Sequence, residues 1–110
     1  MLMLPEVNVF IATAPTDMRK SFDGLAILVQ QELKKKVFSG DLFVFFSRKV
    51  DRVKILYWDR NGYCVWAKRL EKGCFRLPRV QGKVIPMRTH ELALLLEGID
   101  LTDKRRLRAV

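Results

Sequence analysis

The chain has little of several residue types that particular functions require. Its 110 residues include only two cysteines, Cys64 and Cys74, and one histidine, His90. A disulfide framework needs more cysteines, and a zinc site needs more cysteine or histidine ligands. We therefore expect two reduced thiols, no bound metal and no cofactor.

Long hydrophobic runs are missing as well. No apolar stretch approaches the ~18 residues of a membrane span, and the opening "MLMLPEVNVFIATAP" has no cationic leader. These features predict a cytoplasmic protein with no membrane partner. The length suits one domain, which we place at residues 1–101, followed by a basic, flexible tail at residues 102–110.

Acidic residues are scarce relative to basic ones, at 12 against 21, which gives a net charge of +9. A two-metal nuclease needs carboxylates that converge on one point. Almost every acid here instead falls in a turn or near a helix end, where turn formation or capping explains it. No P-loop, dinucleotide-binding glycine motif or nucleophile motif occurs. His90 follows Thr89 at the start of an expected helix, where a solvated position is common. We expect no catalytic residues and no enzymatic activity.

What the chain does have is a regular pattern of strands and helices. We expect a strand at residues 7–13, a helix from about Ser21, strands at 42–47, 53–58 and 63–70, and a helix at 90–97 capped by Thr89. Short extended pieces at 75–77 and 84–87 each meet a proline, which confines them to an edge. The order predicts an α+β fold: a mostly antiparallel β-sheet with a central hairpin and two helices packed against it.

The central hairpin is the stretch "YWDRNGYCVWAKRLEKGCFRLP" at residues 57–78, whose Asn61-Gly62 pair is a strong turn signal because both residues accept positive φ. Its aromatic residues have two interpretations. They could stack on bases beside phosphate-binding cations, or they could be cross-strand pairs of an ordinary core. Alternation of side chains along the strand favours the core. The aromatic residues in question are Trp58, Tyr63, Trp66 and Phe75.

Positive charge gathers in the same region, where residues 48–72 carry eight Lys or Arg against three acids. Fields of this sign attract polyanions, although solubility or an acidic protein partner would also explain them. The residues that we expect to contact nucleic acid are Arg48, Lys49, Arg52, Lys54, Lys68, Arg69, Lys72, Lys104, Arg105 and Arg106.

A second unusual stretch, "TDMRKSFDG" at residues 16–24, places Asp17 and Arg19 on either side of Met18. It is interpreted either as a partner-binding loop or as an aspartate-capped entry to the helix. Together with the hairpin turn it supplies the expected partner-binding residues: Asp17, Arg19, Trp58 and Asp59.

The segments "DMRKSFDGLAILV", "FSGDLFVFFSRKVDRVKILYWDRNGYCVWAKRLEKGCFRLP" and "LALLLEGIDL" together resemble the TnpB accessory protein, the second open reading frame product, of the insertion sequence sixty-six family. The resemblance runs from about Val9 to Leu101. One position departs from the family, since Leu77 stands where a tryptophan is common, which suits packing rather than stacking. The resemblance implies a small protein that is encoded beside a separate transposase and is needed for efficient transposition, but it supplies no biochemical activity.

Two functional hypotheses follow. In the first, the protein binds DNA without catalysis, at the ends of the element or in the transposase–DNA complex. In the second, it is an interaction module that docks on the transposase without touching DNA. The oligomeric state stays open.

Overall fold

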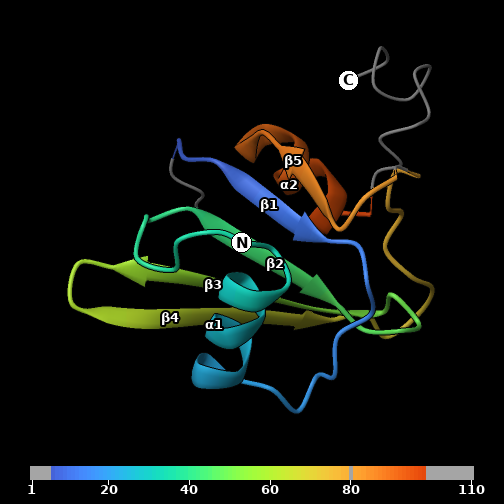
Figure 1. Ribbon diagram of the computed structural model, residues 1–110. Coiled ribbons are helices and arrows are strands. Elements are labelled where there is room, and N and C mark those ends of the chain that lie inside the picture. Colours follow the sequence, from blue (N-terminus) through green and yellow to red (C-terminus); the bar gives the residue numbers. More distant parts are fainter. Residues whose placement is uncertain (1–5, 80, 99–110) are drawn as a thin grey trace.

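The structure is a computed structural model that describes residues 6–79 and 81–98. It contains five strands and two helices in the order β1 (Val9–Ala12), α1 (Phe22–Gln31), β2 (Leu42–Phe46), β3 (Arg52–Asp59), β4 (Gly62–Arg69), β5 (Val84–Met87) and α2 (Thr89–Leu96). Figure 1 shows the strands as one sheet, with β4 and β5 at its two edges. The predicted α+β class, with a mostly antiparallel sheet and two helices packed on it, is confirmed.

The strand order in the sheet is β4-β3-β2-β1-β5. Among the strands of the described residues, only β1 and β2 pair in parallel. A parallel pair needs a crossover connection, and α1 with its flanking loops provides it. The β3–β4 hairpin has the two longest strands and occupies one side of the sheet, with β4 as the edge strand.

The sheet has apolar side chains on both faces, because one helix covers each face. On the first face, Leu92 and Leu95 of α2 pack with Val44 and Ile55. The opposite face presents Phe43, Phe45 and Leu56 to α1, whose Leu25 and Val29 pack against them. The central strand β2 is buried over its whole length, which explains why "LFVFF" reads as a continuous apolar run.

The hairpin turn differs from the prediction. Asp59 pairs with Gly62, so Arg60 and Asn61 form the loop, and the positive φ of 50° belongs to Arg60. This register places Leu56 opposite Val65 on the face that α1 covers. Burial of side chains on that face fixes the register more strongly than the turn preference of Asn-Gly.

Two other expectations need correction. Residues 75–77 form no strand; the Phe75 N–H donates a single hydrogen bond to Val50 O at 2.7 Å, and the Phe75 ring is buried against Phe46. The N-cap of α2 is Arg88, one residue before the predicted Thr89, with the Glu91 carboxylate accepting a hydrogen bond from the Arg88 N–H. Thr89 is buried as the first residue of the helix, where its hydroxyl donates to Glu6 Oε1.

Candidate nucleic-acid interface

Two turns that are distant in sequence lie side by side at one end of the β3–β4 hairpin. Residues 47–51 join β2 to β3, and residues 70–75 follow β4. The Leu70 N–H donates to Asp51 O at 2.8 Å and the Phe75 N–H donates to Val50 O. The first turn is also internally braced, since the Ser47 hydroxyl donates to Asp51 Oδ1 at 2.9 Å and accepts from the Arg52 N–H. These bonds give the cations of both turns a defined common location.

We call this location the basic end. Within it, Arg52 and Arg69 are directly opposite each other on neighbouring strands, which places their Cβ atoms about 5 Å apart. Their acidic neighbours compensate only in part, because Arg69 contacts Glu71 at 3.3 Å and Arg52 approaches Asp51 no closer than 3.9 Å. All these groups have exposed atoms, so the ion pairs are weak. The basic end consists of Arg48, Lys49, Arg52, Arg69, Lys72 and Arg76.

Of these six, Arg76 was not among the predicted contact residues. It is exposed between the buried Phe75 and the half-buried Leu77. The alternation "CFRL" is the signal that would have revealed it, because a buried Phe75 directs the next side chain outward. The half-buried Leu77 packs against the α2-side core, as its departure from the family pattern suggested.

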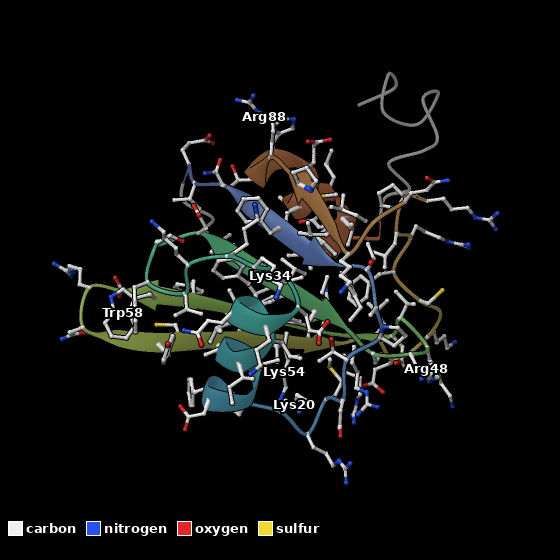
Figure 2. The ribbon with its side chains drawn as sticks, in the orientation of Figure 1. Lys20, Lys34, Arg48, Lys54, Trp58 and Arg88 are labelled. Atoms are coloured by element: carbon white, nitrogen blue, oxygen red, sulfur yellow. The ribbon has the colours of Figure 1, made fainter. Side chains whose placement is uncertain are left out.

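Lys54 and Lys68 lie outside the basic end and already have partners. Lys54 Nζ donates to Lys20 O at 2.7 Å, on the α1 side of the sheet. Figure 2 shows Lys54 and Lys20 near each other beside the lower turns of α1. Lys68 is on the opposite face, where its Nζ donates to Leu96 O at 2.9 Å. Lys54 therefore joins the sheet to the loop just before α1, and Lys68 joins it to the last residue of α2. A count of cations along the sequence does not reveal these bonds. The predicted contacts Lys104, Arg105 and Arg106 lie outside the described residues, as does the proposed tail.

The predicted partner-binding residues come from two separate places. Asp17 and Arg19 form a local fork, in which Arg19 Nη2 donates to Asp17 Oδ2 at 2.7 Å, and the Arg19 Nε and N–H donate to the same carboxylate. The hydrogen bonds from Arg19 hold the pKa of the Asp17 carboxyl well below its usual range. Because the Thr16 N–H donates to Phe46 O, this loop passes the end of β2 where the first basic turn begins.

Trp58 and Asp59 lie at the other end of the hairpin. Figure 2 shows Trp58 and Arg48 at opposite ends of the sheet. Trp58 forms an aromatic cluster with Phe38 and Tyr63, with centroid distances of 4.8 Å from Phe38 to Trp58 and 5.1 Å from Trp58 to Tyr63. Phe38 is 61% exposed, while Trp58 and Tyr63 are half-buried. Sequence reasoning missed Phe38, although an isolated aromatic residue before "SGD" is a signal of exposure.

The two remaining aromatic candidates belong to the core. Phe75 is buried, and Trp66 packs against the same α2-side cluster. For these two residues the packing interpretation is correct. Burial also raises the pKa of the neighbouring Tyr57 hydroxyl, with a further contribution from Cys64 opposite it.

Within residues 6–79 and 81–98, no three or more His, Cys, Asp and Glu side chains gather where they could hold a metal ion. Neither helix of that part of the chain is both long and apolar enough to cross a membrane.

Comparison with known proteins identifies the family. The profile described as IS66 Orf2 like protein matches residues 7–106, nearly the whole chain. The chain belongs to the IS66 Orf2-like family. Two curated relatives come from Sinorhizobium fredii: the uncharacterized protein y4hO, 43% identical over 101 residues, and the uncharacterized protein y4jC, 36% identical over 100 residues. The matches cover 89% of this chain and 88% of y4hO, and 91% of this chain and 86% of y4jC. No solved structure matches.

Membership of the IS66 Orf2-like family supports a role as an accessory protein of insertion-sequence transposition. The family description names no ligand, so the physical role of this IS66 Orf2-like protein depends on its own surface.

Proposed function

We propose that this IS66 Orf2-like protein contributes to transposition by binding DNA without catalysis, and that the basic end is the surface that does so. The element's ends, or the complex of the transposase with them, would be the target. Phosphate oxygens would be the main acceptors, so the interaction would supply affinity and orientation with little sequence discrimination.

The observation that carries the proposal is the cross-strand pair of Arg52 and Arg69. Like charges directly opposite each other in a sheet lower its stability. Here the turns on both sides add the further cations Arg48, Lys49 and Lys72. Their acids, Asp51 and Glu71, compensate the two arginines only in part. A polyanion bound at this end would neutralise the repulsion. Phosphates along a DNA strand provide closely spaced negative charge of the required kind.

The experiment is fluorescence anisotropy with a labelled duplex of the element's terminal repeat and a scrambled duplex, each titrated over a range of salt concentrations. Log affinity falls as log salt rises, and we call the magnitude of this negative slope the salt slope. Each lost phosphate contact should lower the salt slope by about 0.9. We expect the double variant Arg52→Gln/Arg69→Gln to lower the slope by about 1.8 on both duplexes.

Arg60→Gln is the matched control, because Arg60 is an exposed arginine on the same hairpin at the opposite end. It should leave the slope unchanged. A loss in Arg60→Gln about half as large as that in the double variant, which is the same loss per charge removed, would show that only net charge matters. No binding of the native protein at low salt would refute DNA binding altogether.

A second candidate function, docking on the transposase, is favoured by the exposed Phe38 of the aromatic cluster. Exposed aromatic side chains are typical of interface hot spots. In this case the protein should copurify with the transposase after nuclease treatment, and Phe38→Ser should abolish the copurification while Arg52→Gln/Arg69→Gln should not.

A further inference from the structure

The two edges of the sheet differ in their protection against pairing with another strand. Edge strand β5 is four residues long and contains Pro86, which has no N–H to donate. Edge strand β4 is twice as long, and its residues 62–67, "GYCVWA", contain neither a charge nor a proline. Short strands, charges and prolines are the usual devices that protect an edge. The first six residues of β4 have none of them.

The backbone of β4 presents a regular row of free groups along this edge. Leu70 follows β4 in the same register, opposite Asp51, and its N–H donates to Asp51 O, so position 70 is one that bonds to the β3 side. In an antiparallel pair, the residues that bond to the neighbouring strand alternate along the chain. The even-numbered residues of β4 therefore bond to β3, and the N–H and C=O groups of Tyr63, Val65 and Ala67 point outward. In the described part of the chain, no strand lies on that side of β4.

Helix α1 gives independent evidence that something covers this edge. Phe22 precedes Leu25, Ala26 and Val29 by three, four and seven positions, so it lies on the stripe that faces the sheet. Those three residues are at most 8% exposed, whereas Phe22 is 47% exposed. The bond from Lys54 Nζ to Lys20 O places the start of α1 over the β3–β4 side, as Figure 1 shows. We interpret the exposure of Phe22 as the lack of a further strand beneath it.

We propose that two copies of this chain associate by pairing their β4 strands antiparallel, with Trp66 of each copy at the two-fold axis, so that the two five-stranded sheets become continuous. The proposal is independent of DNA binding.

The side chains of β4 are self-complementary in this register. Trp66 meets its own copy, and Val65 meets Ala67, so a larger side chain faces a smaller one. Tyr63 meets Arg69, an arrangement in which a guanidinium lies beside an aromatic ring. Cys64 meets Lys68. Within the paired residues 63–69, no position places like charges opposite each other, and cross-strand pairs of these kinds favour a register.

The positive charge of the chain does not oppose the pairing strongly. Arg69 of one copy lies opposite Tyr63 of the other, so the two Arg69 side chains are separated by six residues, about 20 Å along the strands. This is more than twice the screening length of about 8 Å at physiological salt. Apart from Arg69, the members of each basic end lie outside the paired residues 63–69, and both outer edges of the joined sheet are then β5 strands that contain Pro86.

The first test is sedimentation velocity over a range of protein concentrations without DNA. We expect the native protein to form a dimer and Val65→Pro to weaken the association by about tenfold or more, because proline removes an outward N–H without removing a bond to β3. Val65→Thr keeps the N–H and the β-branched shape, and should still dimerise. A monomeric native protein, or an undiminished dimer of Val65→Pro, would overturn the proposal.

Two further comparisons retain their force if Val65→Pro fails to fold. Phe22→Ser should weaken the dimer. Ile27→Ser should not, because Ile27 is about equally exposed, at 48%, but lies on the solvent side of α1.

In a background of Cys64→Ser and Cys74→Ser, Trp66→Cys should form an intermolecular disulfide, because the facing Cα atoms of a non-hydrogen-bonded antiparallel pair are about 4.5 Å apart. Ala67→Cys should not, and a faster reaction there would refute the register. Slow hydrogen exchange of the outward amides of β4 in a monomeric protein would mean that a segment of the same chain covers this edge, and would overturn the proposal.

Discussion

The two ends of the β3–β4 hairpin are built differently, although the same two strands form both. At the basic end, backbone hydrogen bonds from Leu70 and Phe75 join two turns, and the buried Phe75 ring holds the second turn against the core. At the other end, the aromatic cluster depends on ring contacts, and its outermost member Phe38 is mostly exposed. The cations therefore have a rigid support, whereas the aromatic surface could change with little effect on the fold. Rigid support is what an electrostatic binding surface needs to hold charges in register with a polyanion.

The largest expected effect on stability concerns Phe75, whose buried ring holds the second turn of the basic end against the core. Phe75→Ala should lower the free energy of unfolding by about 3–5 kcal/mol, because it leaves a cavity beside Phe46. Phe38→Ala, at the other end, should cost no more than about 1 kcal/mol, since the ring is exposed. Urea denaturation followed by circular dichroism measures both.

If Phe75→Ala does not fold, Phe75→Leu keeps most of the volume and should still cost more than Phe38→Ala. Equal costs at the two ends would show that the second basic turn is not held by the core.

How far the sequence predicts this arrangement depends on the separation of the partners. The helix stripe and the alternation in β3 depend on neighbouring residues, and both led to the correct elements. The turns that carry Arg48 and Lys72 could likewise be recognised from local composition. The partners of Lys54 and Lys68, in contrast, are carbonyl oxygens of residues 20 and 96.

No local pattern indicates such distant acceptors, so all cations of the hairpin looked equivalent in the sequence. The turn register was missed for a related reason: the preference of Asn61-Gly62 is local, but burial beneath α1 decides which residues face each other. Phe38 was overlooked because its neighbours Trp58 and Tyr63 are brought to it only by the fold.

The next effect distinguishes the role of Lys68 from that of its neighbour Arg69. Lys68→Met should lower the free energy of unfolding by about 1 kcal/mol, because it removes the hydrogen bond to Leu96 O at the end of α2, where a cation also interacts favourably with the helix dipole. Its effect on the salt slope of DNA binding should be small. Arg69→Gln should behave in the opposite way, with little change in stability and a slope lowered by about 0.9.

Thermal unfolding and anisotropy on the same two variants test this distinction. A larger loss of DNA binding in Lys68→Met than in Arg69→Gln would show that the basic end extends across the edge of the sheet to the α2 face.

A smaller effect of opposite sign concerns the arginine pair. Arg52→Thr should raise the free energy of unfolding by about 0.5 kcal/mol at low salt, because it relieves the repulsion from Arg69 and places a β-branched residue in a strand. The part due to repulsion should fade in about 1 M salt, where the screening length is about 3 Å. DNA affinity should fall in the same variant. A loss of stability would mean that the two guanidinium groups do not repel each other in the free protein, and the argument for an anionic ligand would then lose its main support.

The smallest effect decides whether Arg19 belongs with the basic end. The fork with Arg19 holds the pKa of Asp17 low, so its contribution is present above the ordinary aspartate pKa of about 4 and is lost only as the pH falls well below that value. Both side chains are exposed, so the free energy of unfolding of Asp17→Asn should differ little from that of the native protein at neutral pH.

A carbon-detected NMR titration of Asp17 should show a carboxylate that remains ionised at pH values where ordinary aspartates become protonated. An ordinary titration would mean that the fork is open in solution, leaving Arg19 free, and Asp17→Asn would then leave the salt slope of DNA binding unchanged. With the fork closed, the same substitution releases Arg19 and should raise the slope by up to about 0.9.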